Sequence, residues 1–167
     1  MAKSVGVVCC SRKPDTNELV AHLQVRGSWN HEKDKPETWP GGCQVTAHGK
    51  LKPDETFEQG RDREVREELG RRFGDALAPH DFIEVMRAGE GDDAVVTYAT
   101  LVDHALMGTV ELHRDSPKLR EIQLHEVQGI QDLRSFDKGT GVTDLRTIAM
   151  FDDEKWAVRA ALERFGS

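Results

Sequence analysis

Three glutamates form the most conspicuous chemical pattern in the chain. Glu64, Glu67 and Glu68 stand at positions i, i+3 and i+4, so on a helix they share one face. Carboxylates this close repel one another unless a cation lies between them. Mg²⁺ prefers oxygen ligands and retains several waters, so a few carboxylates together with substrate phosphates complete its shell. The spacing therefore indicates a divalent-cation site, whereas either of the last two glutamates alone would indicate only a solvated helix face.

The glutamates end a longer pattern that runs from Gly49 to Gly70. It reads Gly-x5-Glu-x7-Arg-Glu-(apolar)-x-Glu-Glu-x-Gly, with Glu55 and Arg63 at its other charged positions. This segment resembles the Nudix box at every fixed position, and the order of strand, loop and helix around it is similar to that of Nudix hydrolases. The resemblance implies an α+β protein with the Nudix fold, an α/β/α sandwich around a mixed β-sheet.

The resemblance also implies a reaction and a metal. It implies a hydrolase acting on phosphoric anhydrides, in which water attacks a diphosphate inside a nucleoside diphosphate derivative while metal ions neutralise the developing charge. The implied cofactor is Mg²⁺, with Mn²⁺ as an alternative. The implied metal ligands are Glu64, Glu67, Glu68 and the backbone carbonyl of His48. Glu64 is also the candidate base that activates water, and Arg63 belongs to the catalytic set.

Other positions of the box imply structural roles. Arg63 and Glu55 are expected to form a buried ion pair that fixes the loop to the helix, Gly49 to allow a tight loop, and Gly70 to end the helix. The family usually has an apolar residue after the last glycine, where this chain has Arg71. We expect Phe73 to take over the packing of that position and the helix exit to change slightly.

A Pro-Gly-Gly sequence at residues 40–42 lies earlier than in many members of the family. Either the loop before Gly49 carries an insertion, or the chain belongs to a group with a separate glycine at the start of the box. The fit of Gly49-x5-Glu55 without a gap favours the second interpretation.

Hydrophobic periodicity predicts the elements that position the box. Thr56–Leu69 is the clearest helix, because Thr56 and Gln59 form a capping box and a glycine follows the last turn. Asp152–Phe165 is a second helix with one apolar face. Strands are predicted at Ser4–Cys10, Glu18–Arg26, Cys43–Ala47, Lys50–Leu51, Phe82–Met86, Ala94–Leu101, Gly108–His113 and Val127–Ile130, with the first two forming a hairpin.

Composition limits the classes of protein that fit. A chain of 167 residues with 37% hydrophobic residues suits a single domain over residues 1–167. The net charge of −7 argues against a protein that coats nucleic acid. The apolar runs are far shorter than the roughly 20 residues of a membrane span, and the N-terminal residues show no signal-peptide pattern. We therefore expect a cytoplasmic protein. The family resemblance implies that it acts, as a monomer or homodimer, on a small phosphorylated substrate.

Cysteine and histidine spacing gives no sign of a zinc site. Cys9, Cys10 and Cys43 lack metal-binding spacing and are expected to be small hydrophobic residues in a reducing compartment. The seven histidines are scattered along the chain, and their positions indicate neither a catalytic dyad nor a metal cluster.

Residues outside the box are weaker candidates for the site. Trp29 and Trp39 flank a polar loop just before the box and are candidates for stacking on a nucleobase. Glu111 and Glu121 are candidates for a further metal ligand, a general base or a substrate contact. Arg26 is one of several cationic residues that are candidates for phosphate contacts.

The substrate class stays open at this level. Signatures of NADH, ADP-ribose and dinucleoside polyphosphate enzymes are absent after the box, which leaves nucleoside triphosphates, deoxynucleoside triphosphates or a nucleotide-sugar by default. RNA 5′ ends and inositol pyrophosphates also stay open. Two alternatives share the fold. One is an isopentenyl diphosphate isomerase-like enzyme, but the chain lacks a cysteine just before Gly49. The other is a non-catalytic ligand-sensing domain, which typically loses box glutamates that this chain retains.

Overall fold

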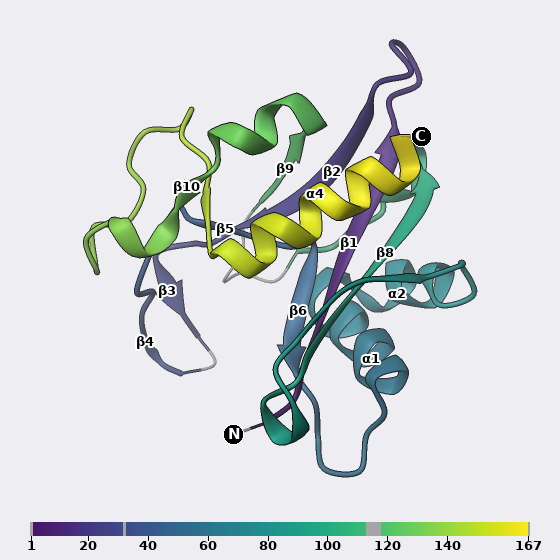
Figure 1. Cartoon of the computed structure of the whole chain (residues 1–167), viewed down its shortest axis with the longest axis horizontal. Helices are drawn as coiled ribbons and strands as arrows, with labels where there is room; N and C mark the ends of the chain where they lie inside the picture. Colours follow the sequence, from purple (N-terminus) through teal and green to yellow (C-terminus); the bar gives the residue numbers. More distant parts are fainter. Residues whose placement is uncertain (1, 32, 113–117, 167) are drawn as a thin grey trace.

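A central mixed sheet organises the protein (Figure 1). The computed structural model describes residues 2–31, 33–112 and 118–166. Within that part of the chain, the longest strands run side by side in the order β2, β1, β8, β7, and β1 is parallel to β8. The strands of this sheet are β1 (Ser4–Arg12), β2 (Leu19–Val25), β5 (Cys43–Gln44), β6 (Ala47–Lys50), β7 (Ile83–Ala88), β8 (Val95–Asp103) and β9 (Lys118–Ile122).

Helices cover both faces of the sheet. In Figure 1, α4 crosses the near face, and α1 and α2 lie behind the sheet. The helices are α1 (Phe57–Leu69), α2 (Arg71–Leu77), α3 (His104–Met107) and α4 (Asp152–Gly166), with 3₁₀ turns η1 (Gly91–Asp93), η2 (Leu124–Gly129) and η3 (Leu133–Ser135). Two small ribbons pair β3 (Trp29–Asn30) with β4 (Lys35–Pro36) and β10 (Gln131–Asp132) with β11 (Ala149–Met150). The expected α+β sandwich around a mixed sheet is confirmed.

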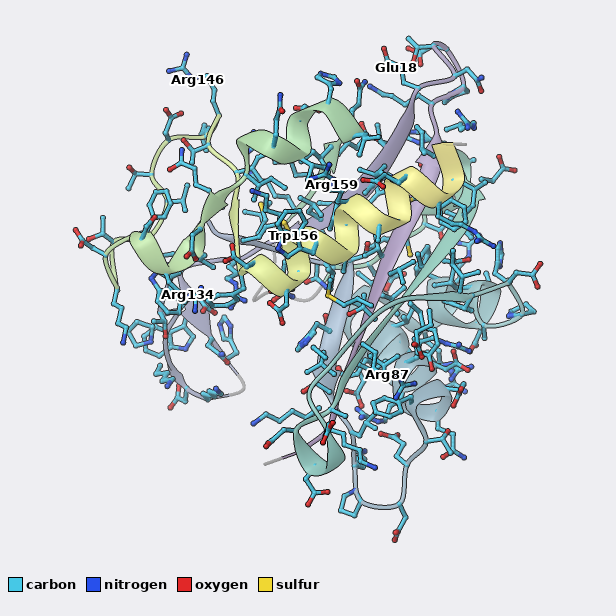
Figure 2. All side chains as sticks on the ribbon, in the orientation of Figure 1. Glu18, Arg87, Arg134, Arg146, Trp156 and Arg159 are labelled. Carbon is cyan, nitrogen blue, oxygen red and sulfur yellow. The ribbon has the colours of Figure 1, made fainter. Side chains whose placement is uncertain are left out.

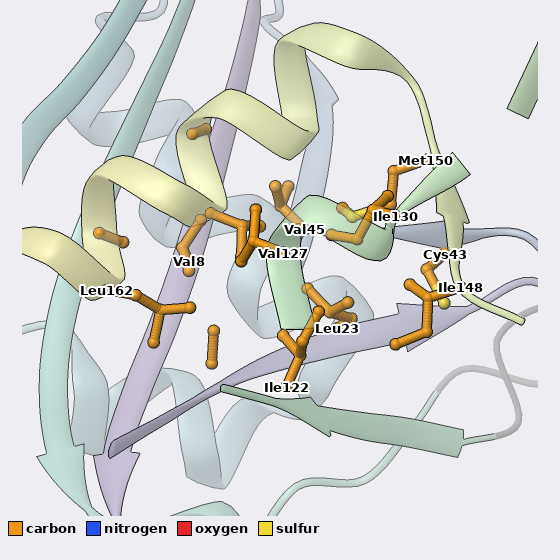
Figure 3. Packing of buried hydrophobic residues seen from close by; sticks show 14 of the residues in the cluster. Val8, Leu23, Cys43, Val45, Ile122, Val127, Ile130, Ile148, Met150 and Leu162 are labelled. Atoms are coloured by element: carbon orange, nitrogen blue, oxygen red, sulfur yellow. The ribbon is translucent and has the colours of Figure 1, made fainter. Parts of the chain in front are cut away.

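Alternation along β1 builds the two halves of the core. Val8 and Cys10 point toward α4, where they join Leu23, Val127 and Leu162 (Figure 3). The intervening residues of β1, Val7 and Cys9, point to the opposite face and contact the apolar side of α1 and α2.

On the solvent side of α4, the Trp156 ring and the Arg159 guanidinium form a cation–π contact, with 5.6 Å between the guanidinium carbon and the ring centre (Figure 2).

The strands β1 and β2 separate along their length, and the chain from β5 to β6 fills the gap. β1 pairs with β2 over residues 9–12 and with β6 over residues 4–7. Thr46, fully buried between β5 and β6, accepts a hydrogen bond from the Cys9 amide at 2.8 Å and donates one to the His22 carbonyl. This threonine therefore fixes the crossing segment to both strands, and the segment leads directly into the box.

The predicted first helix and its caps are confirmed. The Thr56 side chain accepts a hydrogen bond from the Gln59 amide at 3.1 Å, and the Gln59 side chain accepts one from the Thr56 amide at 2.9 Å. Gly70 ends the helix with φ of 96°, a backbone conformation that side chains disfavour. The three cysteines are buried and unpaired, and burial raises the pKa of the Cys9 thiol to about 12.

Two predicted strands are wrong. Residues 108–112 form a turn after α3, since the amides of Thr109 and Val110 bond back to carbonyls of α3; residue 113 lies outside the described residues. Val127–Ile130 belongs mostly to η2, whose last turn closes through a bond from the Ile130 amide to the Val127 carbonyl.

Among the elements that the sequence did not predict are β9 and α2. β9 carries mostly charged residues and lacks the alternation of a half-buried strand, because it lies on the outer side of β2. α2 follows Gly70 directly and contains Gly74. Because glycine disfavours helix, both residues predict a loop after α1 and not a second helix. Its Phe73 is fully buried against Val65 and Leu69, as expected, whereas the Arg71 side chain is 90% exposed.

We predict that Phe73→Ala lowers the free energy of unfolding by about 3–5 kcal/mol, because it leaves a cavity between α2 and the sheet. Urea denaturation followed by circular dichroism measures this. Arg71→Ala, two residues away on the surface, is the matched control and is expected to change it by less than about 0.5 kcal/mol. Equal effects of the two substitutions would contradict the packing role of Phe73.

Candidate active site

The box glutamates lie where α1 faces β2 and β6. Glu64 and Glu68 are turned toward the strands, and the Glu64 side chain is only 13% exposed. Glu67 lies at the rim of the same face and is 55% exposed. The helix spacing therefore places two carboxylates in a sheltered position and a third at the edge of solvent.

Gly49 provides the space for the Glu64 carboxylate. It lies within β6, opposite Val5 of β1, and so is part of a strand and not of a tight loop. A Cβ atom at this position would overlap all three atoms of the Glu64 carboxyl group. The requirement for glycine is therefore steric, since the carboxylate rests directly on the backbone of the strand.

Two polar groups from the sheet hold Glu68. The Gln24 side chain, on β2, donates a hydrogen bond to Glu68 Oε1 at 2.7 Å and a second one to the Thr46 carbonyl. The His48 amide donates to the same Glu68 oxygen at 3.2 Å. The sequence reasoning missed Gln24; its signal is a glutamine at a position of β2 that is fully buried.

Arg63 connects the carboxylates to the loop before α1. Its guanidinium forms a two-bond fork with Glu55, with N–O distances of 2.8 and 2.9 Å, and a further bond with the Lys50 carbonyl. The remaining nitrogen contacts Glu64 at 2.8 Å and Glu67 at 3.1 Å. The hydrogen bonds from Arg63 lower the pKa of Glu55 to about 2. Both side chains of the fork are less than one-fifth exposed, so the expected ion pair is present and largely sheltered.

The electrostatics of the paired carboxylates favour a cation. Burial raises the pKa of Glu64, and burial together with the neighbouring Glu64 charge raises the pKa of Glu68 well above its ordinary value. Each carboxylate is thus disfavoured as an anion as long as only protein surrounds it. The donor set consists of oxygens, which suits a hard divalent ion such as Mg²⁺ or Mn²⁺. The residues present therefore fit the metal that the box implies.

A cleft of about 570 Å³ adjoins this centre through His48. Arg26 and Phe151 line it, with the guanidinium 5.5 Å from the ring centre. Arg134, labelled in Figure 2 near the start of α4, lines the same cleft and lies 3.6 Å from Asp152. Asp152, Asp153 and Glu154 also line the cleft. It thus combines an aromatic ring and two arginines, which suit a phosphorylated aromatic compound, with acidic groups.

Glu154 is a cleft residue that the sequence gave no reason to select. Its carboxylate accepts a hydrogen bond from the Val45 amide at 3.1 Å. Burial raises its pKa to about 7 despite that bond and the nearby Arg26. It belongs to the first turn of an amphipathic helix. An acidic residue there is ordinarily explained by its favourable interaction with the helix dipole alone.

The two tryptophans predicted to stack on a nucleobase lie in different surroundings. Trp39 donates a hydrogen bond from Nε1 to the Phe136 carbonyl at 3.0 Å, and its ring meets Phe151 edge-on at 5.4 Å. It therefore supports an aromatic wall of the cleft. Trp29 lies in the β3–β4 ribbon and is 39% exposed.

The two predicted glutamates outside the box lie elsewhere. The Glu111 amide bonds to the Leu69 carbonyl at 2.9 Å, beside the end of α1. Glu121 lies on β9, within ion-pair distance of Lys13 and His104. None of these contacts involves a box glutamate, and the role of both residues in the catalytic centre stays a prediction.

Comparisons with known proteins give a family match and similar folds. A family model described as the NUDIX domain matches residues 2–142. No curated protein gives a significant match. Among solved structures, a mutT/nudix family protein from Listeria innocua is similar at a TM-score of 0.63 and 18% identity, covering 98% of this chain and 96% of that chain.

A second similar structure is the NUDIX domain of NrtR from Shewanella oneidensis, solved as a complex with ADP ribose. Its TM-score is 0.62 at 16% identity, with 99% of this chain and 88% of that chain covered. The MutT protein from Methanosarcina mazei Go1 is similar at a TM-score of 0.50 and 20% identity over 78% of this chain and 82% of that chain. At these identities the likeness concerns the fold.

We predict a pH-dependent effect of Glu154→Gln on stability. A carboxyl whose pKa is about 7 in the folded protein, against 4.5 ordinarily, holds its proton more tightly when folded. Its contribution to stability is therefore complete below about pH 4.5 and is lost as pH rises to about 7. Glutamine keeps the acceptor for the Val45 amide and never ionises. Relative to the unmodified protein, the variant is expected to gain about 2–3 kcal/mol at pH 8 and nothing near pH 4.5.

Thermal denaturation at several pH values measures this difference. Glu90→Gln, at an exposed position, is the control and is expected to show no such trend. A constant difference between Glu154→Gln and the unmodified protein across the pH range would contradict the raised pKa.

Proposed function

The chain belongs to the Nudix family of pyrophosphohydrolases, and on that premise we propose that it hydrolyses a diphosphate linkage in a nucleoside diphosphate derivative with Mg²⁺ as cofactor. The observation that carries this proposal is the sheltered carboxylate set. Glu64 and Glu68 are sheltered neighbours whose pKa values are raised, and Glu67 lies at the rim of the same face.

Glu64, Glu67, Glu68 and the His48 carbonyl are the groups that would hold the metal. A divalent ion bound there would neutralise phosphate charge and acidify a water molecule. Mn²⁺, with similar ligand preferences, is the alternative ion. The His48 amide already bonds to Glu68, which brings this part of β6 next to the carboxylates.

The chain's own residues divide the remaining work. Glu64 is the proposed base that receives a proton from the attacking water. Arg63 occupies Oε1 of Glu64 at 2.8 Å, which leaves Oε2 for that role. Glu55 holds Arg63 in place through its two-bond fork, so that the guanidinium positions Glu64 and Glu67 together.

The cleft beside His48 is the proposed substrate site. Arg26 and Arg134 suit the charge of a phosphorylated substrate, and Phe151 offers a face for a nucleobase. We propose a nucleoside or deoxynucleoside triphosphate, or a nucleotide-sugar, as the substrate. The ADP ribose held by the NrtR domain makes this compound a necessary member of any substrate panel.

Neither alternative has a supporting observation in the site. An isomerase-like reaction needs a cysteine beside the box glycine, but Cys43 is fully buried in β5 and burial raises its thiol pKa to about 11. A sensing domain without catalysis does not need the carboxylates that this chain retains.

A search of the described residues for a membrane-spanning helix found none of sufficient length and hydropathy.

A hydrolysis screen with Mg²⁺, in which the nucleotide products are separated by chromatography, tests the proposal. The panel comprises nucleoside triphosphates, deoxynucleoside triphosphates, nucleotide-sugars, ADP-ribose, dinucleoside polyphosphates and capped RNA. Turnover of one class supports the proposal and names the substrate. Binding of a nucleotide without turnover, by folded protein in the presence of Mg²⁺ or Mn²⁺, would support the sensing domain instead.

We predict that Glu67→Gln/Glu68→Gln lowers kcat/KM by about 10³-fold or more, because metal stabilisation of the transition state contributes several kcal/mol. Glutamine at position 68 retains an acceptor for the Gln24 and His48 donors, so the fold is expected to persist by circular dichroism. Glu90→Gln is the control with unchanged turnover. Turnover that survives the double substitution would reject this site.

We further predict that Gly49→Ala lowers kcat/KM by about 10²-fold or more, because the added methyl group displaces the Glu64 carboxylate. Gly129→Ala is the matched control, since a Cβ there meets no atom within 4 Å. The Mg²⁺ concentration that gives half-maximal rate is expected to rise in the first variant only. Wild-type kinetics in Gly49→Ala would contradict the steric role of this glycine.

A further inference from the structure

A second group of metal-ligating side chains lies apart from the box. His22, His104 and Glu121 come from β2, α3 and β9, and the pairing of the two strands sets His22 directly opposite Glu121. One ligand atom from each residue lies within 4.8 Å of the others. The scattered positions of the histidines in the sequence gave no sign of this group, because 82 residues separate the two rings along the chain and only the fold brings them together.

The distance between His104 and Glu121 suits a tetrahedral ion. His104 Nε2 lies 3.4 Å from Glu121 Oε2. Two ligands about 2.1 Å from a tetrahedral Zn²⁺ are themselves about 3.4 Å apart. Lys13 Nζ lies 3.7 Å from the other oxygen of Glu121, so the carboxylate presents Oε2 to the imidazole.

Ser11 orients the two rings. Its hydroxyl is 2.7 Å from His22 Nε2 and 2.9 Å from His104 Nδ1, and the ring centres are 5.8 Å apart. A serine hydrogen-bonded to a histidine that contacts a glutamate suggests a nucleophile, but Ser11 is fully buried and no substrate reaches its hydroxyl. The arrangement instead holds two imidazoles beside a carboxylate.

The His22 ring is in the form that binds metals. Burial, with a contribution from the neighbouring His104, lowers the pKa of His22 to about 4, so this ring is neutral at physiological pH. Neutral imidazole nitrogen is a ligand for Zn²⁺ and related transition metals, whereas Mg²⁺ prefers oxygen. Two histidines with one carboxylate, and a fourth position for water, form an established type of zinc shell.

We propose that His22, His104 and Glu121 bind a Zn²⁺-type transition-metal ion at a site separate from the Nudix box. Such an ion links β2 to α3 and β9, which lie far from β2 in the sequence, and so stabilises the edge of the sheet that carries β9. Glu121 is then a ligand of this second site and not of the catalytic metal.

Metal content in excess Mg²⁺ tests the proposal. Chelator-treated protein is dialysed against Zn²⁺ with Mg²⁺ present, and bound zinc is measured by mass spectrometry. The experiment uses the Glu67→Gln/Glu68→Gln protein, so that the box does not contribute. One equivalent of zinc is expected, with loss of at least 10-fold in affinity after either His104→Ala or Glu121→Gln. His125→Ala, at an exposed histidine outside the group, is the matched control and is expected to retain the metal.

Co²⁺ provides a second readout that does not depend on activity. Visible absorption typical of four-coordinate Co²⁺ is expected in the parent protein and absent after Glu121→Gln, an exposed and isosteric change that leaves the fold intact. No zinc above the level of a non-specific control in the parent protein, or full retention in the His104 and Glu121 variants, overturns the proposal. A negative result in these experiments leaves the hydrolase proposal unaffected, because neither experiment measures catalytic turnover.

Discussion

Carboxylates that are held together away from water repel one another, and the centre of this protein depends on how that repulsion is balanced. Glu64 and Glu68 lie one helical turn apart, and the pKa of each is raised. Arg63 compensates one oxygen of Glu64, while Gln24 and the His48 amide compensate one oxygen of Glu68. These hydrogen-bond donors are too few to compensate a full negative charge on both Glu64 and Glu68. The remaining oxygens therefore favour a divalent cation, which is the property that a phosphate-cleaving site requires.

The sheet creates the place where this balance is set. Because β1 and β2 separate, the segment from β5 to β6 enters between them and is fixed by Thr46 to both strands. The same segment presents Gly49 to Glu64 and the His48 amide to Glu68. The Gln24 amide closes the arrangement by joining Thr46 to Glu68. A disturbance in the crossing strand is thus transmitted directly to the carboxylates.

Two groups of potential ligands lie along β2 with different chemical character. Near Gln24 the donors are carboxylate oxygens on α1, which suit a hard ion that exchanges with substrate and water. Two residues earlier, His22 joins His104 and Glu121 in a group that suits a softer ion held for stability. Ligand type separates the two groups, so Mg²⁺ and Zn²⁺ need not compete for one site.

The sequence alone determined the local features of this protein. The helix from Thr56, its capping box, the shared face of the glutamates and the alternation of β1 follow from periods of 3.6 and 2 residues that covalent geometry imposes. The family pattern likewise anticipated the pair of Arg63 and Glu55, eight residues apart. Tertiary structure alone decided which distant residues meet. Glu121 meets His104 and lies opposite His22, and charged β9 became a strand only because β2 offered an edge. Such contacts depend on strand order and register, which no local period encodes.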